Sequence, residues 1–423
     1  MLRRSFLISS ALLACANAFA TQKYIEKDGE FKILGTPYIV GGGTSCANII
    51  FAANKISLAD IYISSQQDPD FKEPKAFFQS STTGKKHAGT IHNVRVYGLK
   101  AGMRYTVKIV AKELVQYWNW KWKKGEGYGE IYLGKIIEQT KNPDGGEIAF
   151  TTTSAKNKVL KFAVLNDTHE RPKVINSLMD ALPKDYEFLI MNGDMLDYIG
   201  DERKLFRNLV DPVAKNLNCQ KPVYFLRGNH ETRGKQAEDF YTYFPTKSGK
   251  TYYAFRAGPV FFLCLDLCED KPDDSWEGRF LNDFTHYRNT EFKWVKDVVN
   301  SPAFKEAKCR IVVQHIPPAM DYMAYRTKND THFDSLLKDK NINLMLCAHM
   351  HKYYYVPANA DQMEIYKDGK YKSKIANENK TLPFPIIVNS NNESMYVSVE
   401  NEIKVDFYGQ NGNKSRESLT FKL

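Results

Sequence analysis

Apolar runs of strand length that end abruptly in polar residues dominate the C-terminal two thirds of the chain. The clearest is Phe188–Met191, which is followed directly by Asn192-Gly193-Asp194. Four more apolar runs end in the same manner, at Asp167-Thr168-His169, Gly228-Asn229-His230-Glu231, His315 and His349-Met350-His351. Because open α/β sheets keep their chemistry at the carboxyl ends of their strands, we expect these side chains to meet at one edge.

Helical patterns alternate with these strands. Pro172 begins a helix whose apolar positions share one face, at Ile175, Leu178, Met179 and Leu182. Further helices are predicted at 202–216, 236–243 and 290–300, and strands at 395–399 and 403–408 are expected to close the second sheet. Residues 158–423 are therefore predicted to form a layered α/β domain with two sheets flanked by helices. The polar segments 268–289 and 357–381 are the predicted substrate-facing loops.

Residues 21–154 follow a different pattern, of short alternating segments separated by turn residues. Strands are predicted at 47–52, 61–64, 91–97, 105–111 and 148–152. This pattern predicts an N-terminal all-β sandwich, joined to the α/β domain by the polar linker 156–158. Within it, Trp118, Trp120 and Trp122 lie on one side of an extended strand. They indicate either a hairpin packed on the neighbouring domain, which we favour, or a stacking platform for a ligand.

Residues 1–20 have the pattern of an export signal. Arg3-Arg4 precede an apolar run, and Ala18-Phe19-Ala20 supplies a small-x-small cleavage site. The LRRSFL stretch is also typical of twin-arginine export, and the stretch ending at Cys15 is similar to a lipobox, so a lipid-anchored form stays an alternative. Export to the periplasm or the exterior, by a general or a twin-arginine signal, is the prediction.

Composition changes this picture little. The chain has 423 residues, of which 43% are apolar and 26% charged, and no stretch beyond the N-terminus is long and apolar enough for a membrane span. The formal charge of +10 becomes +8 without Arg3 and Arg4 (10 minus 2), and the lysines are scattered among acids, so nucleic acid is not an expected partner. The six cysteines beyond residue 20 lack metal-site spacing and are predicted to be mostly or entirely free thiols.

The polar residues at the strand ends supply carboxylate, amide and imidazole groups, which suit divalent cations. Their order, D-x-H, G-D-x-x-D, G-N-H-E, a lone His and H-x-H, resembles the calcineurin-like metallophosphoesterases. The resemblance implies two divalent ions, manganese, iron or zinc, with Asp194 bridging them. One ion would be held by Asp167, His169, Asp194 and His351, and the other by Asp194, Asn229, His315 and His349. His230 would be catalytic, by stabilising the transition state or protonating the leaving oxygen.

The N-terminal segment IHNVRVYGLKAGMRYTVKIV and the later FTTTS resemble the fibronectin-type domain that precedes the catalytic domain of purple acid phosphatases. In that resemblance, Tyr105 pins the turn 99–105 by a side-chain hydrogen bond. Two positions depart from the families: Ala348 stands where a glycine is usual, and Asp197 stands where purple acid phosphatases place a metal-binding tyrosine. Tyr198 is one residue late, so the chain is predicted to lack the tyrosinate colour.

Together these patterns predict an exported phosphoesterase that hydrolyses small phosphate monoesters by attack of a metal-bridging hydroxide. A phosphodiesterase with the same centre is the nearest alternative. An adhesion or binding protein with a vestigial metal site is the alternative from another class, and the presence of every expected ligand argues against it.

Overall fold

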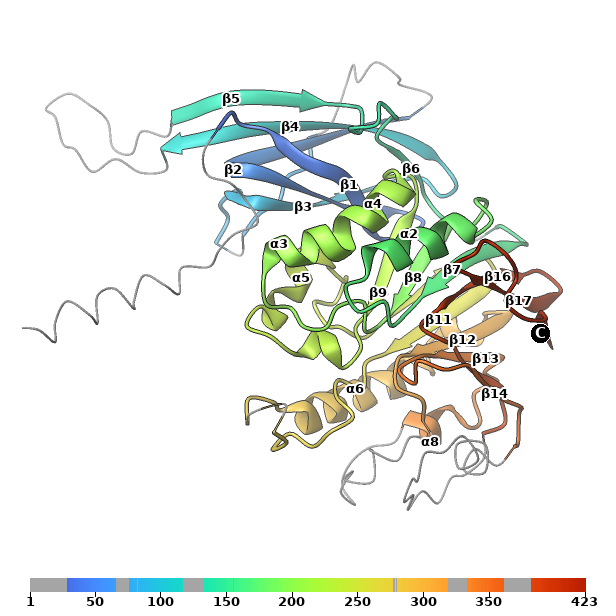
Figure 1. Ribbon diagram of the computed structural model, residues 1–423. Coiled ribbons are helices and arrows are strands. Elements are labelled where there is room, and N and C mark those ends of the chain that lie inside the picture. Colours follow the sequence, from blue (N-terminus) through green and yellow to red (C-terminus); the bar gives the residue numbers. More distant parts are fainter. Residues whose placement is uncertain are drawn as a thin grey trace, which may run out of the picture.

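Two large sheets, packed face to face, form the centre of the protein (Figure 1). The computed structural model describes residues 29–65, 76–81, 83–116, 132–154, 156–276, 278, 280–318, 333–360 and 382–423. The first sheet runs, in order, β18 (Leu419–Lys422), β17 (Glu402–Gly409), β16 (Glu393–Val399), β7 (Leu160–Leu165), β8 (Phe188–Asn192), β9 (Pro222–Leu226), β1 (Ile33–Gly42), β2 (Cys46–Ser65), β4 (Arg104–Gln116) and β5 (Tyr132–Gln139). Off this path, β3 (Gly89–Tyr97) pairs with β2, and β6 (Ala149–Thr151) pairs with β4.

The second sheet runs β10 (Tyr253–Ala257), β11 (Val260–Leu265), β12 (Cys309–Gln314), β13 (Leu344–Cys347), β15 (Ile386–Val388) and β14 (Tyr354–Val356). Apolar side chains of both sheets, such as Phe162, Phe188 and Phe262, meet in one buried core between them. Helices cover the outer faces, so the predicted α/β fold of two sheets flanked by helices is confirmed.

Helices on the first sheet follow the predicted apolar pattern. Helix α2 (Pro172–Ala181) buries Ile175, Leu178 and Met179 against this sheet. The predicted helix 202–216 forms as α3 (Glu202–Leu205), a π-helical turn η1 (Phe206–Val210) and α4 (Asp211–Leu217). The segment predicted at 236–243 forms as η3 (Ala237–Asp239) and α5 (Phe240–Tyr243).

The outer face of the second sheet carries α6 (Phe284–Val298), α7 (Pro302–Lys305) and α8 (Phe333–Leu337). Helix α6 begins six residues before its predicted start at Thr290. The earlier start is supported by Asp273, whose carboxylate accepts hydrogen bonds from the backbone N–H groups of Phe284 and Thr285. This carboxylate lies far from the helix in sequence, so the local pattern did not reveal the helix start.

The prediction for the C-terminal strands was wrong in one respect. β16 pairs antiparallel with β7, and β17 pairs with β16, so both strands extend the first sheet and not the second. Alternation correctly placed Met395, Val397 and Val399 in the core between the sheets. Alternation identifies the buried face of a strand but does not identify its neighbour in a sheet.

The N-terminal region is β-rich, but its strands differ from those predicted. The predicted strands 47–52 and 61–64 are parts of the 20-residue strand β2, and β1 and β5 were not predicted. The first part of β2 pairs with β1 and β3, and the second part pairs with β4. The predicted turn is present: the Lys100 N–H donates to Tyr105 Oη at 2.8 Å.

The N-terminal region shares the first sheet with the α/β region, so this sheet crosses the predicted domain boundary. Strand β1 pairs parallel with β9 at Ile39–Pro222 and Val40–Val223. Tyr38 Oη donates to the carbonyl of Tyr243 at 3.0 Å. The bounds 21–154 and 158–423 stay a prediction, and the two parts share a sheet and a core.

Several predicted features lie outside the described residues, namely the signal peptide with Cys15, the strand of Trp118, Trp120 and Trp122, and most of the segment 357–381. Among the described residues, no helix is long and apolar enough to cross a membrane. The six described cysteines are free, as predicted, and all but Cys46 are buried.

Candidate metal centre

The carboxyl ends of five strands bring the predicted ligands together. Asp167 follows β7, Asp194 follows β8 and Asn229 follows β9 in the first sheet. His315 follows β12 and His349 follows β13 in the second sheet. His169, Asp197 and His230 have ligand atoms within 4.8 Å of one another, and so do two groups made only of predicted ligands: Asp167, His169, Asp194 and His351; and Asp194, His315 and His349. Asp194 belongs to both groups.

The first group joins two imidazoles and a buried carboxylate. His169 Nε2 lies 2.9 Å from His351 Nε2, and Asp167 Oδ1 lies 3.5 Å from His351 Nε2. The other oxygen of Asp167 accepts from Asn166 Nδ2 at 2.8 Å and from the His349 N–H at 3.0 Å. Asp167 is fully buried, and its Oδ1 has no hydrogen-bond partner among the described residues.

The second group surrounds Asp194 Oδ2. His315 Nε2 lies 3.1 Å from this oxygen and His349 Nδ1 lies 4.0 Å from it. The side-chain oxygen of Asn229 lies 3.2 Å from Asp194 Oδ2 and 3.0 Å from His349 Nδ1, which completes the predicted set on this side. The other oxygen, Asp194 Oδ1, accepts from the His230 N–H at 3.0 Å.

These contacts fit a cation. The Asn229 amide places one of its two polar atoms beside Asp194 Oδ2 and His349 Nδ1, where its oxygen can serve as a ligand. His315 Nδ1 is bonded to the Asn192 carbonyl at 2.7 Å, so its proton sits there and the Nε2 lone pair points at Asp194. Lone pairs that converge in a buried site repel unless a positive charge lies among them. The oxygen and nitrogen donors, with no thiolate, suit divalent manganese, zinc or iron.

The pKa shifts of Asp194 and His315 also indicate that this site favours a positive charge. Burial would raise the pKa of Asp194, but His315 outweighs it and holds this pKa well below the usual range. Burial likewise lowers the pKa of His315, yet the Asp194 carboxylate beside it raises that pKa to about 10. Without a metal, the Asp194 carboxylate therefore favours the protonated, positively charged form of His315.

Hydrogen bonds at the far side of each ring orient the histidines. His169 Nδ1 contacts Asp197 Oδ1 at 3.0 Å, and His349 Nε2 contacts Asp270 Oδ2 at 3.2 Å. A carboxylate in this position fixes the tautomer and makes the ligand nitrogen more basic. Asp270 was not identified as a site residue from the sequence, which placed it only within the polar segment 268–289.

Glu231 was also missed, although it is part of the G-N-H-E block. Its buried carboxylate accepts from the backbone N–H groups of Gly228 at 2.7 Å, Asp194 at 2.9 Å and Leu196 at 3.0 Å. Burial and the Asp194 carboxylate raise the pKa of Glu231 to about 7. Glu231 thus ties the end of β8 to the end of β9 and fixes the backbone that presents Asp194.

The ligand backbone adopts conformations that side chains other than glycine rarely take. Positive φ angles occur at Asp167 (50°), His169 (43°), Asp194 (51°), His349 (72°) and His351 (56°). Such strain persists where surrounding structure enforces it, and it typically clusters at functional sites. Adjacent glycines permit the close approach: a Cβ on Gly228 would lie 2.3 Å from Asp194 Oδ1.

His230 lies beside the centre and is partly exposed. Its Nδ1 is bonded to the carbonyl of Asp197 at 2.9 Å, and its Nε2 lies 3.9 Å from Asp194 Oδ2. Burial lowers the pKa of His230. The charge of Asp194 raises this pKa and that of Arg233 lowers it, both by less than burial does. The Asp197 carbonyl accepts the proton on Nδ1, and Nε2, which lies 3.5 Å from Arg233 Nη1, is the ring nitrogen on the side of the centre.

The two departures from the families have clear structural outcomes. Ala348 is fully buried, its φ is not positive, and its N–H donates to the His315 carbonyl at 2.8 Å, so the methyl group is accommodated. Asp197 is engaged by His169. Tyr198 is 46% exposed and its ring lies under Lys204 Nζ at 4.4 Å, away from the ligands.

Comparison with known proteins agrees with this geometry. Residues 160–353 match the family described as calcineurin-like phosphoesterase. The fold is similar to that of a purple acid phosphatase from yellow lupin (Lupinus luteus) seeds, at 10% identity and a TM-score of 0.59, over 91% of this chain and 74% of that one. It is also similar to PhoD, at 11% identity and a TM-score of 0.56, over 92% and 90% of the two chains. No curated protein matches the sequence.

Residues 160–353 thus match the calcineurin-like phosphoesterase family, and they hold a candidate divalent metal centre. The family match supports a hydrolase.

Proposed function

We propose that the protein is an exported, two-metal phosphoric ester hydrolase that acts on phosphate monoesters. The observation that carries this proposal is the position of Asp194, whose single carboxylate belongs to both groups of converging ligand atoms. Two cations held by a shared carboxylate supply the charge that polarises phosphoryl oxygens and lowers the pKa of an attacking water. The predicted signal at residues 1–20 supports export. The resemblance of the N-terminal segment to the fibronectin-type domain of purple acid phosphatases supports a fibronectin-type module.

The protein's own side chains prepare this chemistry. Asp197, Asp270 and the Asn192 carbonyl fix the tautomers of three histidine ligands, so that their lone pairs face the centre. His230 Nε2 faces the same space from a ring that the backbone holds in place. As the imidazolium, with a proton on each ring nitrogen, His230 would donate a hydrogen bond from Nε2 to a phosphoryl oxygen or give that proton to the leaving oxygen.

A hydrolysis screen tests the proposal. Metal-free protein is supplied with manganese, zinc or ferrous iron and assayed on 4-nitrophenyl phosphate and bis(4-nitrophenyl) phosphate. We expect metal-dependent hydrolysis with the monoester preferred. Asp194→Asn should abolish it, whereas Asp180→Asn, the same change at a surface carboxylate paired with Lys184, should not.

A preference for the diester would replace the monoester assignment with the phosphodiesterase alternative. Absence of hydrolysis with every metal, in a folded protein that binds two metal ions, would favour a vestigial site. Equal activity of wild type and Asp194→Asn would show that the proposed centre is not the catalytic one.

A further inference from the structure

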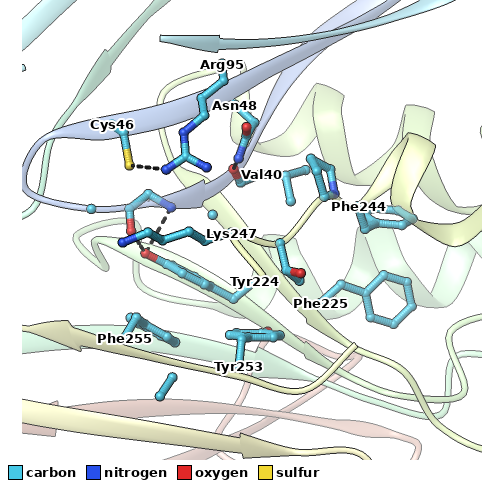
Figure 2. A pocket seen from close by; sticks show the side chains of 16 residues that line it. Val40, Cys46, Asn48, Arg95, Tyr224, Phe225, Phe244, Lys247, Tyr253 and Phe255 are labelled. Atoms are coloured by element: carbon cyan, nitrogen blue, oxygen red, sulfur yellow. Dashed lines mark hydrogen bonds between the residues drawn. The ribbon is translucent and has the colours of Figure 1, made fainter. Parts of the chain in front are cut away.

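A cavity of about 170 Å³ lies beside the place where β1 pairs with β9 (Figure 2). Its walls come from β1, β2, β3, β9 and β10 and from the segment 244–247. None of the proposed metal ligands lines it. On β9 the cavity contacts Tyr224 and Phe225, whereas Asn229 follows beyond the carboxyl end of that strand. It is therefore a separate site.

One side of the cavity is aromatic and flat. The rings of Tyr224 and Phe255 stack with centroids 3.9 Å apart and 5° between their planes. Tyr224 Oη is itself tied to the backbone of Gly42, so the ring cannot swing away. An apolar cavity of about 150 Å³ is large enough for a benzene molecule, so this space holds a body of one ring.

The opposite side is positively charged. Arg95 and Lys247 line the cavity, and among its lining residues none is acidic. Figure 2 shows the Arg95 guanidinium reaching down beside Asn48 toward the cavity. Within the described part of the chain, its hydrogen bond runs from Nη2 to the sulfur of Cys46 at 3.3 Å, and it forms no ion pair with a carboxylate. A thiol is a weak acceptor, so most N–H groups of the Arg95 guanidinium are available to an anion.

We propose that this cavity binds a small organic carboxylate with a flat apolar body of about one ring. The carboxylate would pair with Arg95, and the ring would pack against the stacked pair of Tyr224 and Phe255. Lys247 is exposed at the edge and adds long-range attraction. Inorganic phosphate offers the charge without the apolar body, and benzamide offers the body without the charge.

Calorimetric titration of the metal-loaded protein with benzoate tests the proposal. We expect one saturable site with a Kd of about 0.1–1 mM, a range typical of so small a ligand. Benzamide, acetate and phosphate should each bind at this site more weakly. Arg95→Gln should weaken benzoate binding by about tenfold to a hundredfold, as expected for the loss of charge-assisted hydrogen bonds.

Three controls separate the cavity from the metal centre and from loss of fold. Asp194→Asn should leave benzoate affinity unchanged, whereas carboxylate bound to the metals would respond to it. Arg207→Gln makes the same charge change at an exposed position outside the cavity and should have no effect. If Arg95→Gln fails to fold, Lys247→Gln decides, with an expected loss of about twofold that high salt removes.

The proposal is overturned if benzoate does not saturate, if its affinity is the same in the Arg95 variant, or if it follows Asp194. Equal binding of benzamide would show an apolar cavity without anion recognition, and equal binding of phosphate would show an anion site without a ring pocket. Either result also rejects the proposed ligand class.

Discussion

Asp270 and Asp197 orient histidines that belong to different ligand groups, so their removal should produce separable defects. Asp270 Oδ2 lies 3.2 Å from His349 Nε2, and Asp197 Oδ1 lies 3.0 Å from His169 Nδ1. Loss of such a partner lets the ring rotate and change tautomer. Metal affinity typically falls about 10- to 100-fold, which corresponds to about 1.4–2.7 kcal/mol. Asp270→Ala should therefore weaken one metal-binding event and Asp197→Ala the other.

The chemistry of the substitution sets a further order. In Asp270→Asn, an amide oxygen can still accept from His349 Nε2, but the bond loses its charge. Since charge-assisted bonds are roughly twice as strong as neutral ones, about half of the free-energy loss should remain, a factor of about 3 to 10. Lys271, which also contacts Glu269, keeps a partner in both variants. The expected affinity order is wild type, then asparagine, then alanine.

The assay is calorimetric titration of metal-free protein with Mn²⁺ or Zn²⁺, with metal content measured after dialysis. Asp273→Ala is the matched control, because Asp273 lies in the same segment but bonds the start of α6 and no ligand. It should leave both binding events unchanged. The reasoning is refuted if Asp270→Ala and Asp197→Ala weaken the same event, weaken both equally, or leave affinity intact in folded protein.

Three other predictions follow from the same structure. His230→Ala should retain its metals and lose about a hundredfold to ten-thousandfold in kcat, and an unchanged kcat would remove its assigned role. Iron-loaded protein should be colourless in the visible range because Tyr198 lies away from the ligands; an intense band abolished by Tyr198→Phe would contradict this. Burial, with a smaller effect of His87, lowers the pKa of His92 to about 3, so the unfolded chain binds the extra proton below pH 6.5 and stability falls as pH drops from 6.5 toward 3. Between pH 6.5 and 5, urea unfolding should show a loss of about 2 kcal/mol from this group that His92→Gln lacks; equal losses in both proteins would show that His92 is not responsible.

The polar groups that meet at the strand ends could be predicted because their signals are local. Each ligand follows an apolar run, and burial of that run as a strand places the next residue at the sheet edge. Asp194 and His315 are examples: the structure brings them to 3.1 Å although 120 residues separate them, and the five strand ends taken together predicted this meeting. Helix α2 could be predicted for the same reason, because the apolar residues of its buried face all lie within one short segment.

The tertiary structure decided which residues support those ligands. Asp270 and Glu231 reach the centre through contacts with segments far away in sequence, and the local pattern around each residue does not reveal these contacts. The sequence did not predict the positive φ angles at the ligands either, because a strained conformation is imposed by neighbouring strands and is not a preference of Asp or His.

Strand neighbours were decided in the same way. The sequence by itself determined the chemical groups at the centre, the apolar faces that bury the strands, and the class of fold. Only the folded chain joined β1 to β9 and β16 to β7 and enclosed the cavity beneath Arg95. The physical reason is that periodicity records which side of an element leaves water, whereas pairing depends on the fit between surfaces that are distant in the chain.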